Sequence, residues 1–188
     1  MSTVKHDVLV KVPVREAYDQ WTQFEEFPRF MEGVLEVRQL DPKRLFWRVD
    51  ILGHEAEWHA EIDEQVPDER IEWHSTDGRQ TRGIVRFEPW DMGETKVSLE
   101  MEYELSGLGE GLASALGLIS SQVEGDLERF KEFIESRSTA TGAWRGEIGD
   151  PGRDERAIAE QRQREPGPSA APGGTGIVDE RTGEIRNS

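Results

Sequence analysis

Hydrophobic and polar residues alternate along most of the chain between residues 4 and 105. Alternation with a period of two is typical of β-strands that bury one face. A first strand is predicted over residues 4–12 and ends at Pro13. Further alternating runs between Leu45 and Leu105 are separated by short turns, so they predict a curved antiparallel sheet of about seven strands in all.

Three tryptophans fall on the inward parity of successive strands: Trp47, Trp58 and Trp73. The first tight turn sets Trp47 opposite Trp58, and a turn at residues 65–68 sets Ala60 opposite Trp73. The opposite parity is mostly Glu, Asp, Arg and His, so the outer face is expected to meet water. We therefore expect an aromatic inner face.

Helical spacing follows the first strand and again closes the domain. Residues 14–24 place apolar side chains on one face of a short helix, and a second short helix is predicted over residues 25–31. A long helix is predicted from Leu112 to Ile134, with one continuous apolar stripe. Its first half consists mostly of Gly, Ala and Ser, which leave room beside the sheet, whereas bulk returns after Val123.

The composition changes after Arg137. Residues 139–188 are rich in Gly, Pro and charged residues and poor in apolar ones, so the sequence predicts a domain over 1–138 and a disordered tail over 139–188. Two slightly hydrophobic islands, residues 142–148 and 177–185, interrupt the tail. They are either short partner-binding or self-docking segments, or incidental residues in a tail, and the second interpretation is favoured.

Composition and charge restrict the partners. The net charge of −16 repels phosphate backbones, so no nucleic acid partner is expected. The chain has no Cys, which excludes disulfides and thiolate metal sites. The first residues lack a basic segment before an apolar run, and no window reaches the roughly 18 apolar residues of a membrane span. We expect a cytoplasmic protein without stable membrane insertion.

Two segments near the N-terminus carry a family resemblance. The residues Val12–Trp21 and Phe24–Val34, followed by the Trp-containing strands, resemble the polyketide cyclase/dehydrase or coenzyme Q-binding START-type members of the START-like (SRPBCC) superfamily. The resemblance covers roughly residues 3–137. It implies an α+β helix-grip fold, in which a curved sheet surrounds one long C-terminal helix, and an apolar cavity between the two. It does not imply one activity, because a fold hosts many functions.

Metal and cofactor chemistry finds little support in the sequence. His59 and His74 are expected to face each other, with Glu57, Glu61 and Glu72 nearby, a set that by composition suits a divalent metal. All five have the parity of the solvated face, so a charged outer surface is the favoured interpretation and no metal is expected. Nucleophile, phosphate-loop and dinucleotide motifs are absent, and no cofactor is expected.

The predicted register places few polar side chains inside. Tyr103, Ser75 and Thr81 are expected there, together with the indole N–H groups, but no carboxylate, lysine or histidine. A cyclase-type reaction requires a positioned acid, base or hydroxyl, so Tyr103 and Ser75 are the weak catalytic candidates. A buried tyrosine is more often structural than catalytic.

The sequence therefore favours binding of a hydrophobic small molecule, such as a lipid, an isoprenoid quinone or an aromatic polyketide, between sheet and helix. The segment Phe27–Val34 and the glycine-rich start of the helix are expected to gate the cavity. A cyclase/dehydrase-type enzyme and a protein-interaction module acting through Trp144 and Ile148 are the alternatives. The sequence predicts neither the ligand nor the oligomeric state. The expected ligand-binding residues are Trp47, Trp58, Trp73, Phe87, Met101, Tyr103, Leu112, Leu116 and Ile119.

Overall fold

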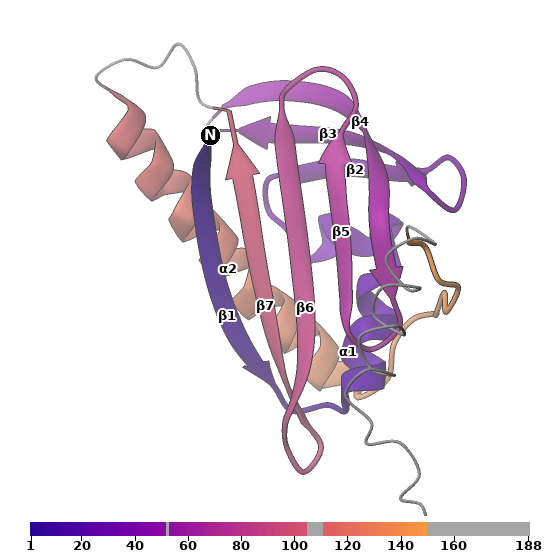
Figure 1. The fold of residues 1–188 in the computed structure, drawn as a ribbon. Coiled ribbons are helices and arrows are strands. Elements are labelled where there is room, and N and C mark those ends of the chain that lie inside the picture. Colours follow the sequence, from indigo (N-terminus) through magenta and orange to yellow (C-terminus); the bar gives the residue numbers. More distant parts are fainter. Residues whose placement is uncertain (52, 105–110, 150–188) are drawn as a thin grey trace, which may run out of the picture. The chain divides into compact units, whose positions relative to one another are not determined.

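The computed structural model describes residues 1–51, 53–104 and 111–149 of the chain. Within these residues, seven strands form one antiparallel sheet in the order β1-β7-β6-β5-β4-β3-β2 (Figure 1). The elements in chain order are β1 (Ser2–Val10), α1 (Val14–Trp21), the 3-10 helix η1 (Phe24–Arg29), β2 (Val34–Gln39), β3 (Arg44–Ile51), β4 (His54–Val66), β5 (Arg70–Ser75), β6 (Thr81–Asp91), β7 (Glu94–Tyr103) and α2 (Leu112–Arg137). The predicted helix-grip architecture is confirmed.

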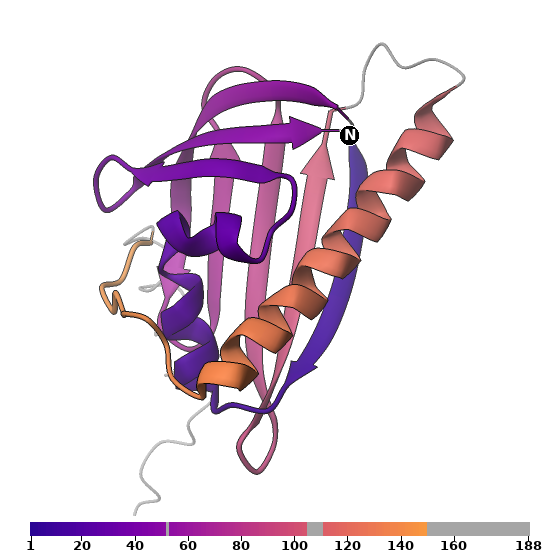
Figure 2. The same ribbon diagram turned by 180° about the vertical axis from the view of Figure 1, so that it is seen from behind.

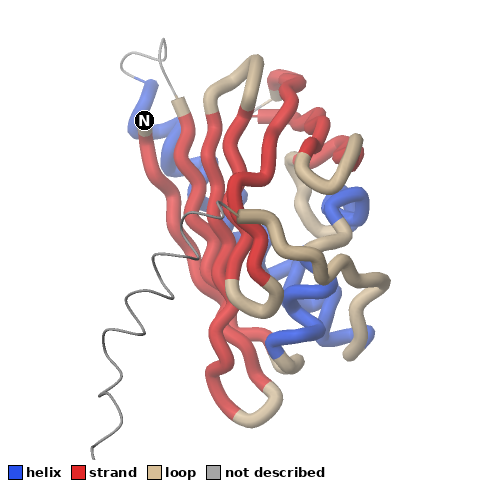
Figure 3. The backbone as a smooth tube through the Cα atoms, turned by 45° about the vertical axis from the view of Figure 1, so that its right-hand side comes forward, coloured by secondary structure: helices blue, strands red, loops and turns tan. Residues whose placement is uncertain are grey.

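The sheet curls around the helices. Figure 2 shows α2 running diagonally across the concave side of the sheet, with its C-terminal end beside α1. Figure 3 shows the helices together on that one side. The inward residues of the strands are apolar and α2 carries an apolar stripe, so both bury their hydrophobic faces against each other in one core.

The strand register agrees with the sequence in one hairpin and differs in the next. Trp47 pairs with Trp58, as predicted. The β4–β5 prediction is wrong by two residues, because Ala60 pairs with Ser75 and Trp73 pairs with Ile62. The turn is shorter than expected, since β4 continues to Val66 and the reversal uses a positive φ of 65° two residues later. A shift of two residues keeps the side chains up to Ile62 on their predicted face of the sheet. Beyond an irregularity between Ile62 and Glu64 the shift is three residues, because Ile71 pairs with Gln65.

The two halves of α2 differ in burial. Leu127, Phe130 and Ile134 in the C-terminal half are almost fully buried. In the N-terminal half, Leu118 is exposed, and a side chain at Gly117 would meet nothing within 4 Å. The helix therefore packs firmly at one end and loosely at the other, as its residue sizes predict.

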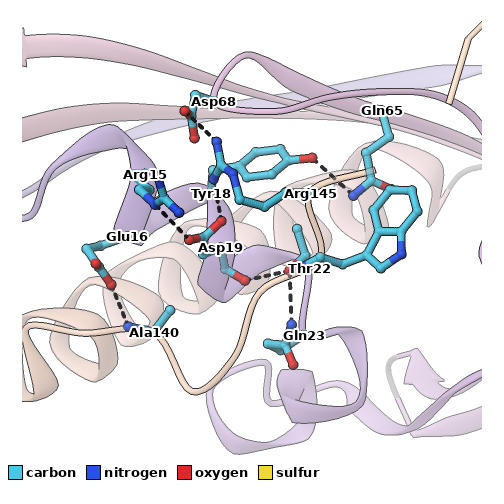
Figure 4. Close-up of polar contacts among 11 residues, drawn as sticks. Arg15, Glu16, Tyr18, Asp19, Thr22, Gln23, Gln65, Asp68, Ala140 and Arg145 are labelled. Carbon is cyan, nitrogen blue, oxygen red and sulfur yellow. Dashed lines mark hydrogen bonds and ion pairs between the residues drawn. The ribbon is translucent and has the colours of Figure 1, made fainter. Parts of the chain in front are cut away.

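Residues 139–149, here called the strap, pack on α1 (Figure 4). The Ala140 and Thr141 N–H groups donate to Glu16 and Gln20, and Ile148 exchanges two backbone hydrogen bonds with Gln65 on β4. The predicted domain boundary at residue 138 is therefore too early for the described part of the chain. Of the two islands, residues 142–148 dock on their own domain, and residues 177–185 lie outside the described residues.

Arg145 forms two ion pairs that hold the strap on the domain (Figure 4). Its guanidinium donates to Asp19 at 2.5 Å and to Asp68 at 2.7 Å, and it lies over the Tyr18 ring at 5.5 Å from the ring centroid. These carboxylates raise the pKa of Arg145. The guanidinium therefore bridges two carboxylates and connects α1 to the β4–β5 turn, a polar contact outside the apolar core.

Candidate functional site: a cavity between the sheet and α2

A cavity of about 110 Å³ lies between the concave face of the sheet and α2. An apolar cavity of about 150 Å³ holds one benzene molecule, so the space here is comparable to a single small ring. Its walls come from both α-helices, the 3-10 helix and six of the strands, β2 to β7, and are mostly apolar. The lining residues are Trp21, Phe27, Met31, Gly33, Val34, Trp47, Val49, Asp50, Ile51, Trp58, Trp73, Thr81, Leu99, Met101, Tyr103, Ile119, Gln122, Val123 and Asp126.

The aromatic wall follows from the strand parity. Trp47, Trp58 and Trp73 all line the cavity, and each is 7% exposed. Gly83 lies opposite Trp73, and a Cβ at this glycine would overlap the indole ring and lie 2.7 Å from the Met101 sulfur. The missing side chain on β6 therefore lets the Trp73 ring lie across the neighbouring strand.

The other predicted lining residues divide into two groups. Met101, Tyr103 and Ile119 line the cavity. Phe87 and Leu116 do not, and the side chain of Leu112 lies outside the described residues. Phe87 points inward as its parity predicts, but it is four residues, about 13 Å, along β6 from Gly83. At that end of the strand it contacts the rings of Tyr18 and Trp21 on α1.

Several lining residues were not predicted from the sequence. Trp21 on α1 and Val123 on α2 belong to apolar stripes that were assigned to the core alone. Phe27, Met31 and Val34 lie in the segment expected to gate the cavity, and they do line it. The helical spacing of these residues was the available signal. It marks an inward face without distinguishing packed core from cavity wall.

The expectation that no carboxylate faces inward is wrong, because Asp126 faces the cavity. It lines the cavity and is 9% exposed. Residues 119, 122, 123 and 126 recur at steps of three or four, so they share one face of α2. Polar Gln122 and Asp126 therefore lie on the same cavity wall as Ile119 and Val123.

Asp126 is held in place by the segment after η1. Its Oδ1 accepts a hydrogen bond from the backbone N–H of Glu32 at 2.9 Å and another from the Arg129 guanidinium. Arg129 Nε also donates to the Phe30 carbonyl at 3.0 Å. Burial raises the pKa of Asp126 above its usual value, although these hydrogen bonds and the Arg129 charge oppose the shift. Desolvation outweighs the charge of the exposed partner.

The two catalytic candidates from the sequence lie in different places. Tyr103 lines the cavity, and its hydroxyl has no hydrogen-bond partner among the described residues. Burial raises the pKa of Tyr103, and the charge of Asp126 raises it further. Ser75 is not a lining residue, and its hydroxyl accepts the Thr81 N–H at 2.9 Å. The two hydroxyls therefore do not form a pair on the cavity wall.

The histidines of the outer face have separate carboxylate partners. His59 Nδ1 lies 2.7 Å from Asp77, and His74 Nδ1 lies 2.8 Å from Asp63. The shifted register sets Glu61 opposite His74, so the two histidines do not face each other as predicted. Across the described ranges, no group of three His, Asp or Glu residues is arranged to hold a metal ion. None of the described helices combines the length and the apolar character needed to cross a membrane.

A seven-stranded sheet curled around a C-terminal helix, with an apolar cavity between them, defines a START-like protein of the helix-grip class. The model of the family described as polyketide cyclase/dehydrase and lipid transport matches residues 10–132. The chain belongs to this family. Its predicted membership of the START-like superfamily is thereby confirmed.

Relatives and solved structures share this architecture. An uncharacterized 17.2 kDa protein of Streptomyces lincolnensis is 44% identical over 149 residues, which are 79% of this chain and 99% of the relative. The Zhui aromatase/cyclase from Streptomyces sp. R1128 superposes with a TM-score of 0.59 at 17% identity, covering 76% of this chain and 99% of that one. A START superfamily protein from Mycobacterium smegmatis gives a TM-score of 0.56 at 16% identity, covering 72% and 96%. At these identities the two solved structures show a common fold.

Proposed function

We propose that this protein binds a hydrophobic small molecule, such as a lipid, an isoprenoid quinone or an aromatic polyketide, in the cavity between the sheet and α2. The observation that carries the proposal is the cavity wall, on which Trp47, Trp58 and Trp73 meet the apolar face of α2. Burying an apolar ligand against such a wall is favourable, at about 25 cal/mol per Å² of apolar surface removed from water. The family description, which names polyketides and lipid transport, supports the same ligand class.

The size of the cavity restricts how the ligand enters. About 110 Å³ is enough for a ring-sized part of a ligand but not for a long chain or a fused polycycle. A larger ligand requires the N-terminal half of α2 or the segment Phe27–Val34 to move away from the sheet. We expect the helix to yield first, because Leu116 in this half of its apolar stripe is only half-buried, whereas Leu127, Phe130 and Ile134 in the other half are almost fully buried.

Mass spectrometry of material extracted from the native protein tests the proposal. Val49 lines the cavity and is 7% exposed, so Val49→Phe fills part of the space, whereas Leu35→Phe adds a ring at a position that is 40% exposed. An apolar molecule is expected to co-purify with the native and Leu35→Phe proteins and to be lost from folded Val49→Phe. Retention of the same molecule at the same stoichiometry in Val49→Phe would contradict the proposed site.

A cyclase/dehydrase-type activity is the second candidate. The observation that favours it is that an acid with a raised pKa, Asp126, and the Tyr103 hydroxyl line the same cavity. A positioned acid or base of this kind contributes typically 10²–10⁴-fold to a proton-transfer step. The similarity in fold to an enzyme whose name is aromatase/cyclase supports the same class.

Turnover of a linear poly-β-ketone separates this candidate from simple binding. An enzyme is expected to form a cyclised product faster than buffer does, and Tyr103→Phe is expected to slow this step while the ligand still binds. A rate of cyclisation equal to that in buffer would leave binding as the function. The third alternative, interaction through Trp144 and Ile148, loses support because Ile148 is buried and paired with Gln65.

A further inference from the structure

The polar groups of the cavity leave hydrogen-bonding capacity unused. Asp126 uses Oδ1 for both of its bonds, so Oδ2 has no hydrogen-bond partner within the described part of the chain. The Tyr103 hydroxyl and the Gln122 amide also lack a partner among those residues. Trp47 Nε1 and Thr81 Oγ1 are buried without one. Native proteins satisfy most buried polar groups, so an unsatisfied set around one cavity points to a ligand that completes it.

We propose that Asp126 and Tyr103 select ligands in which an apolar ring carries a hydroxyl group, that is, a phenol or a cyclic alcohol. The ligand hydroxyl donates to Asp126 Oδ2, and the Tyr103 hydroxyl donates to an oxygen of the same ligand. This inference rests on the proposed binding function, because it concerns ligands in that cavity.

The position of Asp126 fits an acceptor that is fixed before the ligand arrives. The Glu32 N–H and the Arg129 guanidinium both hold Oδ1, and Arg129 is itself held by the Phe30 carbonyl. The carboxylate is therefore oriented from outside the cavity, from the segment after η1. A group that is already oriented loses little conformational freedom when it binds, which favours selectivity at this point.

The charges around Asp126 favour a neutral hydroxyl over an ion. An anionic ligand would be repelled by the carboxylate, and an ammonium would compete with Arg129, which already lies against it. A purely apolar ligand would offer no hydrogen bond to Oδ2 or to the Tyr103 hydroxyl. A hydroxyl both donates and accepts, so it satisfies both residues at once.

Titration with a matched pair of probes tests the inference. Toluene and p-cresol are single rings of similar shape that differ by one hydroxyl. The indole N–H resonances of the cavity tryptophans report binding of either probe in nuclear magnetic resonance spectra of the full chain. Native protein is expected to bind p-cresol about tenfold or more tightly than toluene, the usual effect of a hydrogen bond to a charged group.

Three variants locate the source of the preference. Asp126→Asn keeps an oxygen for the Glu32 N–H but replaces the Oδ2 acceptor with an NH₂ donor, and Tyr103→Phe removes only the hydroxyl. Each is expected to weaken p-cresol binding, Asp126→Asn by about tenfold and Tyr103→Phe by severalfold, with toluene binding unchanged. Asp63→Asn is the matched control, because Asp63 lies on the outer face of the sheet, 2.8 Å from His74 Nδ1, and does not line the cavity. It is expected to leave both affinities unchanged.

The outcomes separate this inference from the proposed function. Failure of both probes to shift the tryptophan resonances would contradict ring binding in the cavity and thus the proposed function. Equal affinity for the two probes in native protein would overturn the hydroxyl preference while ring binding stands. Asp126→Asn protein that loses toluene and p-cresol equally would show that Asp126 only supports the fold, which also overturns the inference.

Discussion

The two halves of α2 show how one helix serves both stability and binding. Phe130 in the C-terminal half lies 5.0 Å from the Trp21 ring and 5.3 Å from the Phe30 ring, centroid to centroid, and is fully buried. In the N-terminal half, Ile119 faces the cavity and Leu118 faces solvent at 57% exposure. Close packing is concentrated at one end, so the other end is able to border an unfilled space without loss of the fold.

Three further segments lie near the C-terminal, closely packed end of α2. Helix α1, the 3-10 helix and the strap all lie beside the C-terminal half of α2 or on α1 itself (Figures 2 and 4). The strap adds the Arg145 contacts with Asp19 and Asp68 there. The difference between the ends shows that close packing is concentrated on one side of the cavity, where Trp21 contacts both Phe130 and the cavity. Regions that must move for a ligand are drawn from the less stable part of a protein.

The largest expected effect contrasts two truncations on α2. Phe130→Ala removes a fully buried ring and is expected to lower the free energy of unfolding by about 3–5 kcal/mol. Leu116→Ala, at a half-buried position in the loose half, is expected to cost about 1 kcal/mol. Urea unfolding followed by tryptophan fluorescence measures both. Equal losses in the two variants would contradict the division of the helix.

Alkaline pH is expected to weaken the packed end through Tyr18. Burial raises the pKa of Tyr18 to about 12 in the folded protein, from 10 for a free side chain. The folded state therefore favours the protonated phenol, whose contribution is complete below pH 10 and is lost as the pH rises through about 12. Two pKa units correspond to about 3 kcal/mol, and the loss approaches this value above pH 12.

Unfolding free energies measured at several values from pH 9 to pH 12 test the Tyr18 prediction. Tyr18→Phe protein is the control, since it lacks the titrating hydroxyl and is expected to show a smaller decline. The remaining decline includes Tyr103, whose pKa is also raised by burial. An identical pH dependence in native and Tyr18→Phe protein would rule out this role for Tyr18.

The next effect concerns Gly83, which leaves space for the Trp73 ring on the cavity wall. Gly83→Ala places a methyl group where the Trp73 indole lies, so the ring must shift. Overpacking of this kind is expected to cost about 1–3 kcal/mol. Displacement of Trp73 also changes the cavity wall, and a weaker affinity for toluene in the same titration is the expected result. Unchanged stability together with unchanged toluene binding would show that Trp73 does not depend on this glycine.

The sequence predicted which side of the sheet each side chain occupies more reliably than it predicted which residues pair across neighbouring strands. The parity of Trp47, Trp58 and Trp73 was sufficient to place all three on the cavity wall, because alternation follows directly from strand geometry. The β4–β5 register was missed because it depends on the exact turn and on an irregularity after Ile62. Turn conformation and bulges respond to tertiary contacts that a hydrophobic pattern does not contain.

The site was harder to predict than the fold for a related reason. Asp126 lies within a helical stripe, but a carboxylate in that position normally indicates the edge of the buried face. Its inward placement depends on the Glu32 N–H and on Arg129, which come from other parts of the structure or the next helical turn. Self-docking of residues 142–148 was the less favoured interpretation of the sequence, because two apolar residues, Trp144 and Ile148, do not form a stripe and the other contacts are hydrogen bonds and ion pairs.

The smallest effect compares two glycines of α2 directly. Gly117 and Gly125 both lie inside the helix, where Gly→Ala normally adds about 1 kcal/mol of stability. A Cβ at Gly117 meets nothing within 4 Å, so Gly117→Ala is expected to raise the free energy of unfolding by about 0.5–1 kcal/mol. A Cβ at Gly125 lies 3.2 Å from the Arg129 guanidinium, the group that holds Asp126.

Gly125→Ala is therefore expected to gain less than Gly117→Ala, because Arg129 must move and its contact with Asp126 weakens. Urea unfolding measures the stabilities, and the p-cresol to toluene affinity ratio reports on Asp126. The ratio is expected to fall in Gly125→Ala and to stay unchanged in Gly117→Ala. If Gly117→Ala stiffens the loose half enough to restrict its movement, slower association of larger apolar ligands follows, with little change for toluene. Equal gains and equal ratios in the two variants would mean that the packed and loose halves respond alike, which contradicts the comparison.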